Sequence, residues 1–214
     1  MTILVVCALQ IEHRLLSRLA RIPGVEVHVT GMGPDRARTW AERSIVPGQR
    51  AVIAAGFCGA LDPDLERGTL IAADVVVDGP DGDAFACDPR LLDAVGDTHR
   101  GRLISLARIA RTPPERAALT GTIVDMESAA LARVAADRGV PFVAIRAVTD
   151  RAHDRLPDLE AVVDGLGRPR PDRLAGLLIR QPRTLGSLVR LLRGVITVRR
   201  SLPNLLTGVV ERVP

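Results

Sequence analysis

Lysine and tyrosine are absent from this chain of 214 residues, and aromatic residues of all kinds make up only 2% of it. The 29 basic residues are therefore all arginines, which we interpret first as a coding bias. Proteins that bind nucleic-acid single strands interleave basic residues with aromatic side chains on which bases stack. Since the basic part of this chain has neither that pattern nor a known motif, we expect no nucleic-acid partner.

Cysteine and histidine are also scarce. The three cysteines, Cys7, Cys58 and Cys87, form no Cys-x-x-Cys pair, and the four histidines are scattered along the chain. Such spacing supports neither a disulfide framework nor a metal site. We therefore predict a protein of the reducing cytoplasm that binds no metal and no cofactor.

Long apolar runs are missing as well. No stretch of about 18 uncharged apolar residues occurs, so we expect no membrane span. The N-terminus lacks the basic segment of a signal peptide. The hydrophobic content is nevertheless 47%, which excludes a disordered chain, and the length suits a single domain over residues 1–214.

Short apolar runs, typical of buried strands, alternate with segments of helical spacing. The expected strands span residues 2–8, 25–30, 51–55, 69–78, 102–109 and 142–148. The expected helices span residues 9–20, 34–41, 90–95, 113–119, 125–138 and 182–200. This alternation predicts an α/β fold with helices on both faces of a sheet.

Charged residues lie unusually close to an expected buried strand in the second half of the chain. Asp125 and Glu127 stand at the start of an alanine-rich helix, and Arg146 and Asp150 belong to the strand that follows. Buried charge is costly unless it is paired or used, so these four residues are site candidates. The alternatives are a capping role for Asp125, a helix-dipole role for Glu127 and a structural salt bridge between Arg146 and Asp150.

Further candidates follow other expected strands. Glu12, the turn at Gly31–Gly33 and the turn at Gly56–Gly59 each come directly after a strand. Because ligands of open α/β sheets gather at the carboxyl ends of strands, we predict that these segments meet Glu127 and Asp150 around one site. The alternatives are a solvated glutamate and ordinary tight turns, since the third glycine of the dinucleotide-binding fingerprint is missing.

Two motifs resemble those of the superfamily of purine nucleoside phosphorylases and methylthioadenosine/S-adenosylhomocysteine nucleosidases. They are Val-Asp-Met-Glu-Ser-Ala-Ala at residues 124–130 and Ala-Ile-Arg-Ala-Val-Thr-Asp at residues 144–150, and residues 8–12 and 56–63 match further landmarks in order. The resemblance covers roughly residues 1–155. It implies a three-layer αβα fold around a mixed, partly barrel-like sheet, and a homodimer. Within the superfamily the chain is most similar to the hopanoid-associated phosphorylases, which are thought to remove adenine from adenosylhopane.

The resemblance also implies roles in cleaving a purine N-glycosidic bond. Asp150, aided by Thr149, would be the general acid at purine N7, which requires a raised pKa. Glu127 would hold the ribose hydroxyls, Glu12 would activate water, and Arg146 would lie near the nucleophile. The other expected substrate contacts are Asp125, Met126, Phe57, Cys58, Gly59 and Ile109.

Two of these positions depart from the nucleosidases that the chain resembles. Phe57 stands where those enzymes usually carry a serine that helps to hold the nucleophile. Ile109 stands where they usually place an aromatic residue against the purine. The sequence leaves open whether the reaction is a hydrolysis or a phosphorolysis. A methylthioadenosine-type nucleosidase and a non-catalytic relative that binds a nucleoside or a membrane are the alternative functions.

Inorganic phosphate is the co-substrate in the case of phosphorolysis. It would meet the N–H groups of Gly33 and Gly59. The positive charge around it would come from Arg36, Arg38 or Arg146.

The C-terminal segment, residues 173–214, is strongly basic, with eight arginines and a single acid, Glu211. Leucine, valine and isoleucine form one broad face of the helix expected at residues 182–200. The opposite face is expected to carry Arg183, Gly186, Ser187, Arg190, Arg193 and Gly194. A basic amphipathic helix is typical of peripheral membrane proteins, and it would bring a lipid-linked nucleoside to the enzyme at the inner face of the membrane. The alternative is a terminal helix packed on the sheet.

Overall fold

The structure is a computed structural model that describes residues 1–168, 170–180 and 184–213. Pro182 and Arg183, which belong to the expected C-terminal helix, lie outside the described residues. The strands are β1 (Ile3–Cys7), β2 (Val25–Val29), β3 (Ala51–Ala60), β4 (Leu70–Asp78), β5 (Ala84–Ala86), β6 (His99–Ser105), β7 (Ile123–Asp125) and β8 (Phe142–Asp150). The helices are α1 (Gln10–Leu16), the 3₁₀ helix η1 (Ser17–Arg21), α2 (Pro34–Ser44), α3 (Pro89–Val95), α4 (Pro113–Ala117), α5 (Ser128–Asp137), α6 (Leu159–Val162), α7 (Pro171–Arg180) and α8 (Thr184–Arg212).

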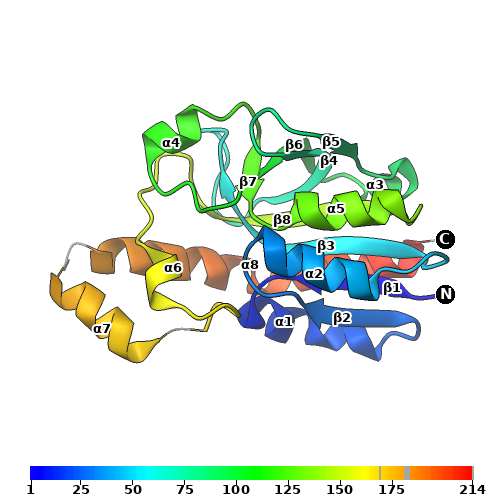
Figure 1. Ribbon diagram of the computed structural model, residues 1–214, viewed down its shortest axis with the longest axis horizontal. Helices are drawn as coiled ribbons and strands as arrows, with labels where there is room; N and C mark the ends of the chain where they lie inside the picture. Colours follow the sequence, from blue (N-terminus) through cyan, green and yellow to red (C-terminus); the bar gives the residue numbers. More distant parts are fainter. Residues whose placement is uncertain (169, 181–183, 214) are drawn as a thin grey trace.

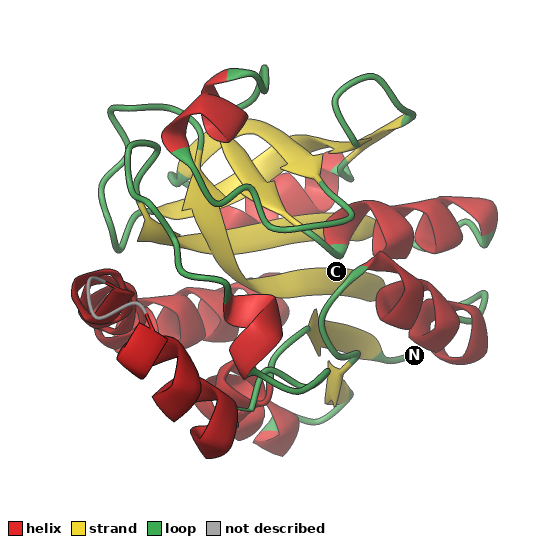
Figure 2. Cartoon of the chain, turned by 60° about the vertical axis from the view of Figure 1, so that its left-hand side comes forward, coloured by secondary structure: helices red, strands yellow, loops and turns green. Residues whose placement is uncertain are grey.

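The strands form one mixed sheet that closes on itself. Its order is β2-β1-β3-β7-β6-β4-β5, and β8 pairs with both β3 and β4. The pairing of β8 is parallel with β3 and antiparallel with β4, so β3, β7, β6, β4 and β8 make a ring. Helices lie on both sides of the sheet (Figures 1 and 2). The predicted three-layer fold with a partly barrel-like sheet is confirmed.

Strand β8 lies at the centre of the core. All nine of its residues are buried, because β3 and β4 flank it and α5 and α8 pack against it. A strand that is covered on both faces is expected to be a nearly continuous apolar run. Arg146, Thr149 and Asp150 interrupt that run, and the structure therefore holds a guanidinium and a carboxyl group inside the core.

Two strand ends differ from the sequence prediction. Strand β3 continues through Gly56–Gly59, where a turn was predicted, because β8 pairs with it as far as Gly59. Strand β6 stops at Ser105 and does not reach Ile109, because its partner β7 ends at Asp125. In both cases the length of the strand is set by pairing with its neighbour and not by its glycine content or its local hydrophobicity.

Helix α8 combines both alternatives for the C-terminal segment. Its second half is packed on the fold, with Val198, Leu202 and Leu206 fully buried. Its first half extends beyond the sheet beside α7 (Figure 1). Gly194, predicted on the polar face, is instead buried against β8: an added Cβ would lie 2.9 Å from the Cα of Thr149. In the described part of the chain no helix is long and apolar enough to cross a membrane.

Candidate active site

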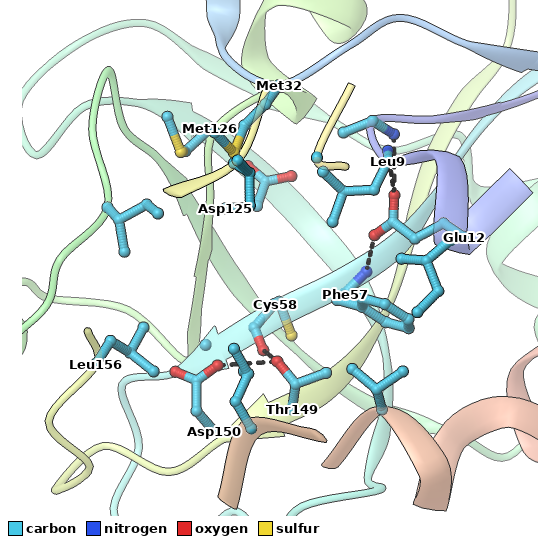
Figure 3. A pocket seen from close by; sticks show the side chains of 18 of the residues that line it. Leu9, Glu12, Met32, Phe57, Cys58, Asp125, Met126, Thr149, Asp150 and Leu156 are labelled. Atoms are coloured by element: carbon cyan, nitrogen blue, oxygen red, sulfur yellow. Dashed lines mark hydrogen bonds between the residues drawn. The ribbon is translucent and has the colours of Figure 1, made fainter. Parts of the chain in front are cut away.

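A cavity of about 410 Å³ opens where several parallel strands end. Residues after β1, in the last part of β3, at the end of β7 and at the end of β8 contribute to its wall. Figure 3 shows Glu12 and Asp150 on different sides of this space, with Asp125 and Met126 on a third. Glu12, Glu127 and Asp150, which the sequence predicts to meet, all line this cavity.

Glu12 lies in the first turn of α1, but it points inward and is only 2% exposed. Its Oε2 accepts hydrogen bonds from the backbone N–H groups of Ala8 and Leu9, at 3.0 and 2.8 Å, and its Oε1 accepts one from Phe57 at 2.7 Å. Burial raises the pKa of Glu12, and Arg146 and the three N–H donors act against that rise. The carboxyl group is thus fixed in place by the backbone of the segment between β1 and α1 and by that of β3, as a base that acts on a bound nucleophile would have to be.

Arg146 lies behind this carboxyl group and is almost completely buried. Its Nη2 forms an ion pair with Asp125 at 2.5 Å and donates a hydrogen bond to the Ser128 hydroxyl at 2.8 Å. The proposed salt bridge between Arg146 and Asp150 is therefore wrong. Asp125 also accepts a hydrogen bond from the Ser128 N–H at 3.2 Å, at the start of α5, so its capping alternative is supported by the structure.

Glu127 precedes the first residue of α5 and is buried. Its Oε1 accepts a hydrogen bond of 2.7 Å from the N–H of Gly33. Burial, followed by the negative charge of Asp125, raises the pKa of Glu127 to about 8. A buried carboxyl group at the wall of a cavity is suited to form hydrogen bonds with sugar hydroxyl groups, as an acceptor when ionised and as both donor and acceptor when protonated.

Asp150 ends β8 on the other side of the cavity. Its Oδ1 accepts a hydrogen bond of 2.8 Å from the Thr149 hydroxyl, and its Oδ2 is paired with Arg116. Burial raises the pKa of Asp150, while Arg116 and Thr149 act against that rise. Arg116 was not among the sequence candidates. The sequence marks only the start of its short helix, through a capping box of Thr112 and Glu115.

Three of the residues predicted to hold a phosphate, Gly33, Arg36 and Arg38, do not line the cavity. The N–H of Gly33 is engaged by Glu127. The Arg36 guanidinium lies against Gly165, where an added Cβ would be 2.6 Å from its Cζ, and it lines a separate hollow of about 540 Å³. Gly33, Arg36 and Arg38 therefore lie together at this second hollow, apart from Gly59, which lines the cavity.

The remaining predicted contacts are found at the cavity. Phe57, Cys58, Gly59, Ile109, Asp125, Met126 and Thr149 all line it. Cys58 is buried as a thiol, and Thr149 Oγ1 lies 3.3 Å from its carbonyl oxygen. Within the described residues no group of three His, Cys, Asp or Glu side chains is placed to hold a metal ion.

One part of the cavity wall is apolar. Leu9 and Ile11 contribute to it from the start of the chain, and Leu191, Leu192 and Val195 contribute from α8. Leu156 and Val163 complete this part of the wall. The cavity thus has carboxyl groups on several sides and a set of branched apolar side chains in its wall, so a suitable ligand has one polar and one apolar part.

The whole fold is shared with nucleosidases of known structure. The 5′-methylthioadenosine/S-adenosylhomocysteine nucleosidase of Helicobacter pylori superposes with a TM-score of 0.74 at 14% identity, covering 99% of this chain and 98% of that one. The futalosine hydrolase of the same organism gives 0.74 at 14% identity, covering 99% and 97%. The S-adenosylhomocysteine nucleosidase of Streptococcus pyogenes gives 0.70 at 18% identity, covering 100% and 98%. These likenesses establish the fold.

The sequence itself matches the family model of the phosphorylase superfamily over residues 18–166. The chain belongs to this superfamily, and it is an enzyme of the nucleoside phosphorylase and nucleosidase class. Comparison with the curated proteins found no match.

Proposed function

We propose that this enzyme releases adenine from a 5′-substituted adenosine whose substituent is large and apolar, by hydrolysis of the N-glycosidic bond. The observation that carries the proposal is that carboxyl groups and a set of branched apolar side chains line the same cavity. We assign Asp150 and Ile109 to the purine and Glu127 and Met126 to the ribose, and we assign the apolar side chains of the wall to the 5′ group. Adenosylhopane, which the sequence resemblance suggests, has the required polar and apolar parts.

The chemistry requires an acid for the base and a nucleophile for the sugar. Asp150 gives its proton to purine N7 as the bond between C1′ and N9 breaks, and the bonding electron pair stays with the leaving adenine. Glu12 takes a proton from a water molecule whose oxygen forms the new bond to C1′. Arg146, close to Glu12, is placed to stabilise charge on that side. After the reaction Asp150 is ionised and Glu12 is protonated, and proton exchange with solvent restores the starting protonation state of each.

Hydrolysis is favoured over phosphorolysis by what the expected phosphate ligands already contact. Gly33 donates its N–H to Glu127, and Arg146 is paired with Asp125. Binding a phosphate dianion at Gly33 would require its hydrogen bond to Glu127 to break, and a phosphate at Arg146 would compete with Asp125 for the guanidinium. Water needs no more than the Glu12 carboxyl group and its surroundings.

A nucleosidase acting on methylthioadenosine is the second candidate. Solved relatives of the same fold carry that activity in their names, and the Streptococcus pyogenes enzyme was solved with 5-methylthiotubericidin. The contribution of Leu191, Leu192 and Val195 to the cavity wall favours a larger 5′ group.

The exposed face of α8 supports contact with a membrane as part of the proposal. Leu185, Val189, Leu192 and Ile196 are between 39% and 60% exposed, and their spacing of four, three and four residues puts them on one face. Exposed arginines of the same helix lie nearby, and its described residues include one acid, Glu211. An apolar face with arginines around it suits an anionic bilayer surface. Leu192 belongs to this face and to the cavity wall, so a lipid-linked substrate would have a short path between them.

Liposome co-sedimentation tests the membrane contact. A variant with Leu185 and Ile196 replaced by serine should lose binding to anionic vesicles. A variant with Val46, a 47% exposed apolar residue in the loop after α2, replaced by serine is the matched control and should keep binding. Equal sedimentation of the α8 variant and the wild type would contradict the membrane role.

The homodimer implied by the resemblance belongs to the same proposal, and sedimentation velocity tests it.

Adenine release tests the catalytic proposal. The substrates are adenosines with 5′ groups of increasing apolar size, from methylthio upwards, each with and without phosphate. We expect release without phosphate and a kcat/KM that rises with the size of the 5′ group. Asp150→Asn should abolish release, whereas Asp97→Asn, the same change at an exposed site, should not. A phosphate requirement would select phosphorolysis, and a preference for the methylthio group would select the second candidate.

A further inference from the structure

A second buried guanidinium lies at the cavity, and the reaction as written above does not use it. Arg116 is 2% exposed although it belongs to a helix of only five residues. Burying an arginine is unfavourable unless its N–H groups find acceptors. Its Nε donates to the carbonyl of Ala110 at 3.0 Å and its Nη1 to that of Arg151 at 2.7 Å. Its Nη2 is paired with Asp150.

We propose that Arg116 is a positioning residue for protonation of the leaving base, which it serves by fixing the Asp150 carboxyl group and stabilising the carboxylate left after proton transfer. The proposal rests on the proposed function, because it assumes that Asp150 is the acid. It adds a residue from α4 to a reaction otherwise carried by residues of α1 and β8 and by Glu127, which precedes α5.

The geometry supports the positioning part. The acceptors of Arg116 come from three segments: its own loop, the end of β3 through the Ala60 carbonyl at 3.5 Å, and the residue after β8. A guanidinium is a rigid planar fork, so three carbonyls leave it little freedom. It therefore holds Asp150 Oδ2 in one place while Thr149 holds Oδ1.

Gly59 makes this arrangement possible. A Cβ added at Gly59 would lie 2.9 Å from Asp150 Oδ2 and 3.3 Å from Arg116 Nη2. The ion pair thus lies directly over the backbone of β3, where any side chain would push it away. This accounts for a glycine inside a strand, a position that otherwise weakens a sheet.

The charges around Asp150 support the second part. When the proton moves from the carboxyl group to N7, Asp150 changes from neutral to anionic, and a guanidinium in contact stabilises the product of that step. Asp154, in the loop after β8, raises the pKa of Asp150, and it is itself paired with Arg67. The Cys58 thiol on β3 also lies nearby, its pKa raised by burial. Burial raises the pKa of Asp150, and Arg116 opposes that rise more strongly than any other group.

Two substitutions separate charge from geometry. Arg116→Gln removes the charge, so we expect kcat to fall roughly 100-fold and the basic limb of its pH profile to move up by about one unit or more. Arg116→Lys keeps a charge without the fork, so we expect about a tenfold fall in kcat with a smaller movement of the limb. KM should change by less than about threefold in both, since the ribose and the 5′ group are bound elsewhere. Arg111→Gln, which removes a half-exposed partner of Asp158 from the same segment, should leave both readouts unchanged.

A measurement without turnover makes the test independent of the proposed function. The Asp150 carboxyl resonance, in protein labelled with ¹³C-aspartate and assigned by its loss in Asp150→Asn, should titrate at higher pH in Arg116→Gln than in the wild type. An unchanged titration, or a fall in kcat with no movement of the basic limb, would overturn the proposal and leave Arg116 a structural residue. If Arg116→Gln does not fold, the same two readouts on Arg116→Lys decide. Failure of the wild type to release adenine from any nucleoside would instead refute the proposed function, while the titration would still report the pairing.

Discussion

A single methyl group added to β3 should disable the enzyme without changing any charge. Gly56 lies beneath Glu12 and Arg146, and the Cβ of Gly56→Ala would lie 2.8 Å from Glu12 Cδ and 2.9 Å from Arg146 Nη1. Atoms at these separations overlap, so at least one side chain must move. Both are held in place, Glu12 by three backbone N–H groups and Arg146 by Asp125.

The magnitude follows from the contacts that must break. A hydrogen bond to a charged group contributes about 1.5–3 kcal/mol. Displacing Glu12 breaks one or two of them, so Gly56→Ala should lower the free energy of unfolding by roughly 2–5 kcal/mol, and a domain of ordinary stability would still fold. Moving a general base out of line should lower kcat by about 10²–10⁴-fold.

Urea unfolding and adenine release measure the two effects. Gly176→Ala adds the same methyl group in α7, where an added Cβ has no atom within 4 Å. That control should keep full activity and gain up to about 1 kcal/mol from the better helix propensity of alanine. Wild-type activity and stability in Gly56→Ala would refute the arrangement of Glu12 and Arg146 described here.

Two further predictions concern α8 and the dependence on pH. Gly194→Ala should press α8 away from Thr149, which should lower the free energy of unfolding by about 1–3 kcal/mol and reduce adenine release. The control is Gly186→Ala, whose added Cβ meets only Arg190, at 3.6 Å. Equal stability and activity of the two variants would contradict this packing. Folding raises the pKa of Glu127 from 4.5 to about 8, so the folded state binds that proton more tightly than the unfolded chain does. The free energy of unfolding should therefore fall as the pH rises through this interval, by at most about 5 kcal/mol. Urea unfolding across that pH range should show a shallower fall for Glu127→Gln, and an unchanged slope would contradict the raised pKa.

The sequence predicts the part of the site that local patterns report. Glu127 and Asp150 were identified because a charged residue next to a buried apolar run is uncommon, and parallel strands bring their carboxyl ends together. Glu12 was found by its place after the first strand. These are properties of one segment at a time, and the fold class follows from the same kind of pattern.

The features that the sequence did not predict depend on contacts between segments. Arg116 belongs to a short helix, and its burial results from acceptors in three other places. The glycine pair predicts a turn at Gly56, but pairing with β8 keeps this residue in a strand. Gly33 was assigned to a phosphate, whereas its N–H is engaged by Glu127, 94 residues away. No local pattern encodes any of these partners.

The central claim is that one cavity holds a purine nucleoside with its base at Asp150 and its sugar at Glu127. The most direct measurement is a crystal structure of the Asp150→Asn variant with an adenosine that carries a long 5′-alkyl group. We predict adenine N7 within hydrogen-bonding distance of the side chain at position 150, the ribose hydroxyls on Glu127, and the alkyl group against Leu191 and Val195 of α8. A nucleoside bound outside this cavity, or bound with its base against Glu127, would contradict the claim.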